Sequence, residues 1–135
     1  MSYDLEIGSD SLTGVWQGRF SYGAADGCAF VATLMELGKH LSGSTHEPDA
    51  SGRGGEDHLF AMIEGTRRGR TISFTKTYDG SGGWTHSVAY EGSLSADGTE
   101  IEGRWSIGAE ASGTFLMLRS GGKAATVAKK AYEHV

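Results

Sequence analysis

Polar and apolar residues alternate along most of this chain with the period of two that is typical of β-strands. The clearest run starts at Leu12, where the even positions are apolar or glycine and the odd positions are mostly polar. Eight such runs can be marked: roughly Leu12 to Tyr22, Cys28 to Leu37, His40 to Thr45, Asp57 to Thr66, Thr71 to Tyr78, Trp84 to Leu94, Ile101 to Ile107 and Gly113 to Arg119. The pattern predicts an all-β protein.

Most breaks between the runs are short and carry turn-forming residues, as in Gly38-Lys39 and Ala96-Asp97-Gly98. Such short connections join antiparallel neighbours, because a parallel crossover needs a dozen or more residues. We therefore expect an up-and-down meander. One connection, His46 through Glu56, is longer and contains the chain's single proline, so we expect a loop at the rim of the sheet there.

A recurring motif, apolar residue, any residue, glycine, predicts that this sheet closes on itself. Its copies are Leu12-Thr13-Gly14, Leu41-Ser42-Gly43, Ile63-Glu64-Gly65, Tyr90-Glu91-Gly92 and Ile101-Glu102-Gly103. Glycine within a strand permits a sharp bend, and bends at matched positions in successive strands allow closure. We expect an eight-stranded antiparallel barrel.

The whole chain of 135 residues fits one domain. We expect an N-terminal arm at residues 1–11 and the barrel at 12–119. After Gly121-Gly122 the residues change to good helix formers, which predicts a short C-terminal helix over 123–134 with Val127 and Ala131 towards the barrel.

The alternation also predicts which side chains point into the barrel. In the four clearest runs the inward residues are Leu12, Gly14, Trp16, Gly18, Phe20 and Tyr22; Ile72, Phe74, Lys76 and Tyr78; His86, Val88, Tyr90 and Leu94; and Ile101, Gly103, Trp105 and Ile107. Inward glycines leave space, and the aromatic residues supply apolar walls. An apolar cavity with a few converging polar groups is the usual form of a small-molecule site. The candidate ligand-binding residues are Tyr22, Phe74, Lys76, Tyr78, His86, Tyr90 and Trp105.

Three runs are apolar on both faces, which predicts a homodimer. We expect Phe30, Ala32, Leu34, Phe60, Met62, Phe115 and Met117 to point inward. The outward residues would then be Val31, Met35, Leu37, Leu59, Ala61, Ile63, Leu116 and Leu118. Because soluble monomers rarely expose large contiguous apolar patches, a second copy of the chain is the expected cover.

Gly14-Val15-Trp16 in the first run, together with Arg119 at the end of the last, resembles the signature of the calycin superfamily, which includes lipocalins, fatty-acid-binding proteins and avidins. The resemblance implies that Gly14, Trp16 and Arg119 are structural, with Trp16 across the closed end of the barrel and Arg119 packed on its ring. Gly103-Arg104-Trp105 is similar to an avidin strand. The chain lacks the disulfides of secreted lipocalins and the paired helices of fatty-acid-binding proteins, so it resembles an outlying, bacterial-type member.

Composition excludes several other classes of function. A net charge of −5 argues against nucleic acid as the main partner. The single cysteine, Cys28, cannot form an internal disulfide, and no run approaches the length of a membrane span. The first residues lack the features of a signal peptide, so we expect a cytoplasmic protein. The histidines and acidic residues around the long loop match no known metal site, and we expect neither a metal nor a cofactor.

These observations favour a barrel that binds a small, mostly apolar molecule, with polar contacts from Lys76, Tyr78, His86 and Tyr90. An alternative is that Lys76 and Tyr78 reach water at the open rim and His86 bonds a backbone carbonyl. Another is an enzyme of the isomerase or cyclase type, in which His86 with Tyr78 or Tyr90 moves a proton. We favour a binding protein over an enzyme. A solid barrel that acts through its outer face is the remaining alternative.

Overall fold

The computed structural model of the chain describes residues 11–21, 27–48, 58–80 and 86–119. It contains eight strands: β1 (Gly14–Ser21), β2 (Cys28–Leu37), β3 (His40–Pro48), β4 (His58–Arg68), β5 (Thr71–Tyr78), β6 (Ser87–Leu94), β7 (Glu100–Ile107) and β8 (Ala111–Leu118). Each strand pairs antiparallel with the next, and β8 pairs with β1 to close the barrel. The predicted all-β meander barrel is confirmed. Residues 1–10 of the N-terminal arm, Tyr22, Trp84 and the C-terminal helix lie outside the described residues.

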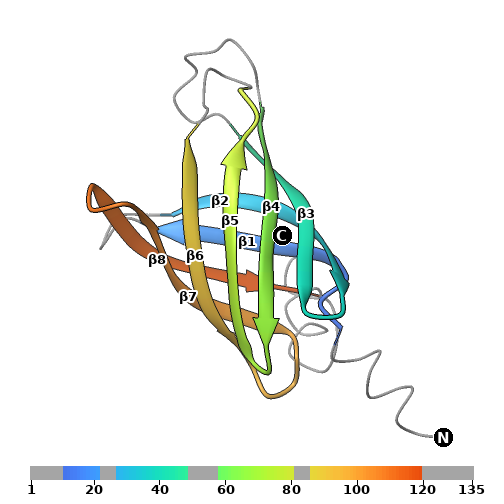
Figure 1. Cartoon of the computed structure of the whole chain (residues 1–135). Coiled ribbons are helices and arrows are strands. Elements are labelled where there is room, and N and C mark those ends of the chain that lie inside the picture. The colour runs from blue at the N-terminus through green and yellow to red at the C-terminus, as the bar shows by residue number, and fades with distance from the viewer. Residues whose placement is uncertain (1–10, 22–26, 49–57, 81–85, 120–135) are drawn as a thin grey trace, which may run out of the picture.

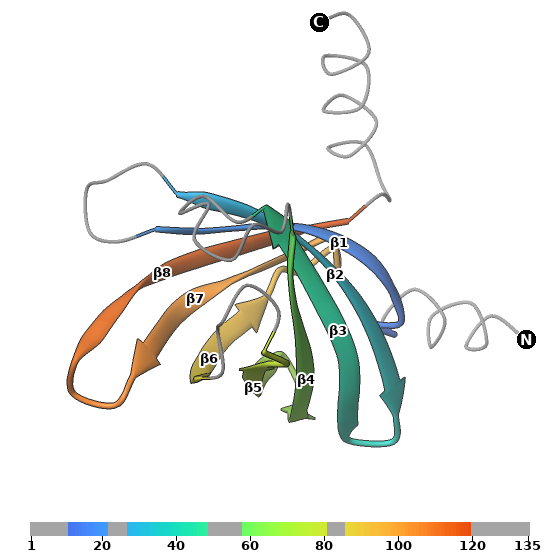
Figure 2. The ribbon, with the colours of Figure 1, turned by 90° about the horizontal axis from the view of Figure 1, so that it is seen from above.

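The barrel is strongly coiled. In Figure 1, β3 to β6 run across the front while β1 and β2 cross behind them at a steep angle. Seen from above in Figure 2, β8, β1 and β2 lie together on one side, opposite β4 and β5. Side chains from these two halves of the sheet meet inside to form one core, which includes Trp16, Phe20, Phe30, Phe74, Tyr90, Trp105 and Phe115.

The glycine motif has the predicted effect. A methyl carbon added at Gly43 would overlap the carbonyl oxygen of Thr33 on β2, and one added at Gly103 would overlap that of Glu91 on β6. Neighbouring backbones therefore approach more closely than any side chain would allow. Such close approach at bends in successive strands is what closes the sheet.

The predicted orientation of β4 is wrong. Phe60 and Met62 point outward and are 48% and 61% exposed, whereas Leu59, Ala61 and Ile63 are buried. Because β4 is apolar on both faces, hydrophobicity alone does not select the inner one. Pairing does: Ala61 lies opposite Tyr78 and Ile63 opposite Lys76, and paired residues point to the same face.

Strand β3 is longer than predicted. Instead of ending at Thr45, it continues to Pro48, with His46, Glu47 and Pro48 paired to the first residues of β4. Pro48 is tolerated because it occupies the last position of the strand. The extension carries Glu47, which was expected in a solvated loop, into the barrel, where it is only 4% exposed.

The two ends of the barrel differ in chemistry. We call the end bordered by the turns at 38–39, 69–70 and 95–99 the closed end. There the guanidinium carbon of Arg119 lies 4.6 Å from the centre of the Trp16 ring, as the calycin resemblance implies. The Trp16 indole donates a hydrogen bond to the Leu12 carbonyl oxygen at 3.0 Å. The opposite end, where β5 ends at Tyr78, is called the polar end.

Candidate functional site

The polar end contains a buried network of three ionisable side chains. Lys76 and Tyr78 point inward from β5, and Glu47 points inward from the extension of β3. The Lys76 ammonium lies 3.3 Å from Glu47 Oε2, and the Tyr78 hydroxyl donates to Glu47 Oε1 at 2.6 Å. The Lys76 and Glu47 side chains are only 1% and 5% exposed. The Glu47 carboxylate is therefore the shared partner of an ammonium and a phenol, and all three groups are buried.

Aromatic rings surround the ammonium on its remaining sides. Lys76 Nζ lies 4.8 Å from the ring centre of Phe20, 5.3 Å from Phe30, 4.9 Å from Tyr78 and 5.3 Å from Tyr90. Each ring face attracts the cation, with an energy of about 0.5–2 kcal/mol per contact. Lys76 is thus enclosed by rings from β1, β2, β5 and β6.

Burial has the largest effect on the protonation of this lysine. Removal from water lowers the pKa of Lys76, and the nearby Glu47 carboxylate opposes that shift without cancelling it. The neutral amine is consequently more accessible here than on a solvated lysine. A lysine of this kind is a candidate nucleophile as well as a candidate binding group.

A further interior group, the hydroxyl of Thr45, makes no hydrogen bond within the part of the chain that the structure describes. Thr45 lies two residues before Glu47 on β3 and is 2% exposed. Thr45 pairs with the small residues Ala32 on β2 and Ala61 on β4. Ala61 pairs in turn with Tyr78 on β5, so Thr45, Ala61 and Tyr78 form one row across neighbouring strands. A buried unpaired hydroxyl destabilises a protein by about 1–3 kcal/mol. Such a group is a candidate contact for a ligand.

The predicted ligand-binding residues divide into two groups. Lys76, Tyr78 and His86 come together at the polar end, where the His86 ring lies 4.9 Å from that of Tyr78. Tyr90 joins them through its ring but also stacks on Phe74 at 4.8 Å. Since Lys76 is buried, the alternative in which it reaches water at the rim is wrong.

Phe74 and Trp105 belong to the core farther from the polar network. Phe74 packs edge-on against Phe115, and the Trp105 indole donates to the Ser21 carbonyl oxygen at 3.1 Å while its ring meets Phe20. These two residues support the wall of the barrel.

Glu47, like Thr45, is a residue of the candidate site that the sequence prediction missed. The signal was present: Leu41, Gly43, Thr45 and Glu47 alternate with polar residues, and extending that period of two by one step places Glu47 inside. The proline that follows and the surrounding polar residues favoured a loop instead. A buried lysine on a neighbouring strand also calls for an acidic partner.

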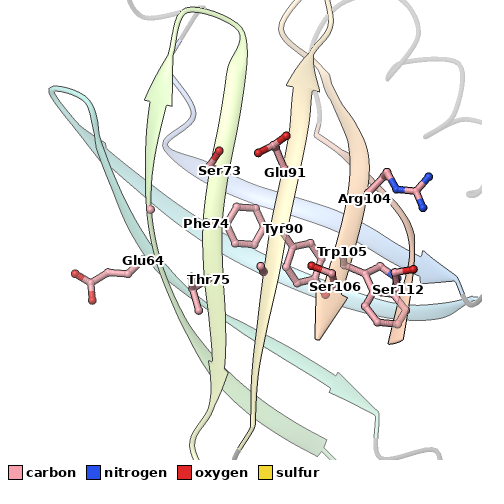
Figure 3. A pocket seen from close by; sticks show the side chains of 12 residues that line it. Glu64, Ser73, Phe74, Thr75, Tyr90, Glu91, Arg104, Trp105, Ser106 and Ser112 are labelled. Atoms are coloured by element: carbon pink, nitrogen blue, oxygen red, sulfur yellow. The ribbon is translucent and has the colours of Figure 1, made fainter. Parts of the chain in front are cut away.

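A hollow of about 450 Å³ lies elsewhere, on the outer surface over β4 to β8 (Figure 3). Its polar side chains are Glu64, Ser73, Thr75, Glu91, Arg104, Ser106 and Ser112. In Figure 3, Glu64 and Arg104 point to opposite sides of this group. Phe74, Tyr90 and Trp105, three of the predicted ligand-binding residues, also line the hollow, whereas Lys76 and Glu47 do not. Tyr90 is at the same time one of the rings around Lys76.

Within the described ranges, no cluster of three or more histidine, cysteine, aspartate or glutamate residues is arranged to hold a metal ion. The same part of the chain contains no helix long and apolar enough to cross a membrane.

Comparisons with known proteins establish the fold alone. No family model matches the chain, and neither does any curated protein. Among solved structures, a redesigned β-barrel matches with a TM-score of 0.66 and 15% identity over 82% of this chain and 92% of its own. A de novo designed fluorescence-activating β-barrel matches with a TM-score of 0.56 and 11% identity over 83% of this chain and 96% of its own.

Proposed function

We propose that the polar end of the barrel binds one small, mostly apolar molecule that carries a carbonyl or carboxyl oxygen. The oxygen would accept hydrogen bonds from Lys76 and from the hydroxyl of Thr45, and the aromatic rings would hold the apolar part. The single observation that carries the proposal is the buried Lys76–Glu47–Tyr78 network beside the unpartnered hydroxyl of Thr45.

Stabilisation of the fold does not explain why this buried network is present. The loss of hydration of two buried charges commonly exceeds their mutual attraction, and well-packed apolar replacements are often neutral or stabilising. The unpaired Thr45 hydroxyl adds a further unfavourable term. Costly polar groups gathered in one place are typical of binding and catalytic sites.

The fold supports the proposal in general terms. An eight-stranded barrel is just wide enough to fill itself with side chains or to hold one small ligand. One similar structure is a designed fluorescence-activating barrel, which shows that a function can be built into a barrel of this architecture. The contact between Trp16 and Arg119 likewise supports, as part of the proposal, an outlying place in the calycin superfamily.

Native mass spectrometry of the protein as purified is the first test, since tight ligands of barrels survive gentle handling. The second is titration with benzoate and benzyl alcohol, which present a carboxylate and a hydroxyl on one small apolar ring. Thr45→Val should weaken their binding about fivefold or more, the loss of one hydrogen bond. Ser44→Ala, at the exposed neighbouring position, is the matched control.

Equal affinity in wild type and Thr45→Val would contradict the proposal, as would the failure of every probe to bind. The enzyme alternative paired His86 with Tyr78 or Tyr90 for proton transfer, and of these two tyrosines Tyr78 donates its hydroxyl hydrogen to Glu47.

We also propose that the outer face is a homodimer interface. The large exposed apolar side chains are Val15, Met35, Leu37, Phe60, Met62, Leu116 and Leu118. All of them lie on β8, β1, β2 and β4, which with β3 are consecutive in the barrel, whereas the outward residues of β5 to β7 are mostly polar or charged. An apolar face confined to one side favours a second copy as its partner.

Light scattering coupled to size exclusion tests this proposal. A dimer mass is expected for the wild type, and Phe60→Ser with Met62→Ser should shift the mass towards that of a monomer. Thr75→Ala with Thr77→Ala, on the polar side, should leave it unchanged. A monomer mass for the wild type at micromolar concentration would contradict the proposal.

A further inference from the structure

The strongest observation at the polar end is that a primary amine, a carboxylate and a phenol meet inside an aromatic enclosure. An amine that only binds an anion does not need a carboxylate at 3.3 Å, because that carboxylate competes with the ligand for the ammonium. A carboxylate in this position is useful when the amine must lose a proton that a later step needs. That requirement points to covalent chemistry at the amine.

We propose that Lys76 condenses with the carbonyl carbon of an apolar aldehyde to form an imine inside the barrel. This inference rests on the proposed function, because it takes the same site and specifies the ligand as an aldehyde. Nothing in the mechanism needs a metal or a redox partner: an amine and an aldehyde give an imine and one water molecule.

The steps follow from the contacts. The Lys76 ammonium passes a proton to Glu47 Oε2, which leaves a neutral amine. The nitrogen lone pair attacks the carbonyl carbon, the C–N bond forms as the C=O π bond breaks, and one proton moves from the nitrogen to the carbonyl oxygen to give a neutral carbinolamine. Glu47 then returns its proton to the carbinolamine hydroxyl. The C–O bond breaks, water leaves, and the nitrogen lone pair forms the C=N bond of a protonated imine beside the Glu47 carboxylate.

Several groups around Lys76 favour this sequence. Burial, which lowers the pKa of Lys76, increases the neutral fraction of the amine. The Tyr78 hydroxyl, 2.6 Å from Glu47 Oε1, fixes the carboxylate in place and acts as a positioning residue. The rings of Phe20, Phe30 and Tyr90 reduce access of water, and exclusion of water opposes hydrolysis of an imine. Cys28 on β2 acts in the opposite direction, towards a higher pKa of Lys76, as Glu47 does.

The unpartnered hydroxyl of Thr45 supplies an independent reason to expect a carbonyl ligand. It is buried, lies in one row of the barrel with Tyr78, and has a hydrogen to donate. A carbonyl oxygen, and later the hydroxyl of the carbinolamine, can accept that bond. The structure therefore contains a nucleophile, a proton acceptor and an oxygen-binding donor in one interior region.

Reductive trapping tests the inference on the intact chain. The protein is incubated near neutral pH with benzaldehyde, and separately with hexanal, in the presence of cyanoborohydride, which converts an imine into a stable secondary amine. Peptide mapping by mass spectrometry then locates the adduct. Lys39, exposed in the turn between β2 and β3, is the internal control because it is a solvated primary amine in the same sample.

We expect more adduct at Lys76 than at Lys39, because burial lowers the pKa of Lys76 and so raises the neutral fraction of its amine above that of a solvated lysine. Lys76→Met should remove the labelling of that peptide, whereas Lys39→Met should leave labelling of Lys76 unchanged. The wild-type map alone decides the question if Lys76→Met does not fold.

Titration with benzoate and benzyl alcohol separates the two proposals. If these probes bind but neither aldehyde labels Lys76 above Lys39, the imine inference is wrong and the binding function stands. If neither the probes nor the aldehydes engage the site, both proposals are wrong. Adduct at Lys76 that competing benzyl alcohol suppresses would support both.

Discussion

The closed end and the polar end of the barrel are built from the same strands but satisfy their polar groups in different ways. At the closed end, Arg119 stacks on Trp16 and donates to the carbonyl oxygens of Gly98 and Ser11. Glu36 accepts bonds from Arg67 and from the Leu12 amide there. The charges at that end lie near the surface and have several partners. At the polar end, one ion pair is buried among aromatic rings.

The closed end therefore contributes to the stability of the fold, whereas the polar end reduces it. The closed end combines a large buried indole with charge-assisted hydrogen bonds, which all favour the folded state. The polar end combines desolvated charges with an unpaired hydroxyl, which oppose it. Locally unfavourable arrangements that persist inside a well-formed fold are typical of functional sites.

The largest expected effect is at the closed end. Trp16→Ala removes a fully buried indole and should reduce the free energy of unfolding by about 3–5 kcal/mol. Val15→Ala, next to it on the outer face and 56% exposed in the wild type, should change stability by less than about 1 kcal/mol. Chemical denaturation of both variants measures the difference. Similar stabilities would contradict the role of Trp16 in closing the barrel.

The second prediction concerns the buried ion pair. Lys76→Met removes the counter-charge of Glu47 and leaves this carboxylate buried with the Tyr78 hydroxyl as a partner, so it should lower the free energy of unfolding by about 3 kcal/mol. Glu47→Gln should act in the same direction, because it leaves the ammonium without its counter-charge.

The double variant should be more stable than the sum of the two losses implies, since neither charge then remains. A double-mutant cycle from urea denaturation measures this coupling, and we expect about 1 kcal/mol or more. Strict additivity would mean that the pair does not interact as the 3.3 Å contact indicates.

Much of the fold could be predicted because its signals are local and repeated. The period of two located all eight strands, and the glycine motif indicated closure. The failure at β4 has a specific cause. Phe60 and Met62 are as hydrophobic as Leu59 and Ile63, so their sequence does not distinguish the faces; pairing with β5 does.

The candidate site was only partly predictable for a related reason. Lys76 and Tyr78 share a face of one strand, so alternation alone brings them together. Their partner Glu47 comes from a strand that β4 separates from β5, and the contact depends on the register of two intervening pairings. Hydropathy carries no information on that register. The unpaired state of Thr45 depends on the same packing.

The third prediction tests whether the polar end is adapted to bind a ligand at the expense of stability. Thr45→Val keeps the shape of the side chain and removes its unpaired hydroxyl, so the ligand-free protein should gain about 1 kcal/mol of stability. The same variant should bind benzyl alcohol more weakly. Thermal unfolding with and without the probe measures both effects. A loss of stability in the absence of ligand would show that the hydroxyl has a structural role.

The smallest expected effects are in the pH dependence, and they separate the two ends. At the closed end, Asp97 accepts hydrogen bonds from Ser95 and Thr99, which lower its pKa. Its contribution to stability is present above the unfolded value of about 3.9 and is lost as the pH falls through the lowered pKa. At the polar end, the lowered pKa of Lys76 means that the unfolded chain binds more protons. Stability should therefore increase as the pH rises from that pKa towards the unfolded value of about 10.4.

Asp97→Asn keeps an acceptor oxygen in the turn but does not titrate, so it should flatten the acid side of the stability profile and leave the alkaline side unchanged. Lys76→Met should flatten the alkaline side of the profile, because it removes the titrating amine at the other end. Urea midpoints measured across the pH range for both variants and the wild type give the two slopes. The two ends would not titrate independently if Asp97→Asn altered the alkaline slope, or if Lys76→Met altered the acid slope and left the alkaline slope unchanged. The separation between a structural end and a functional end would then have to be abandoned.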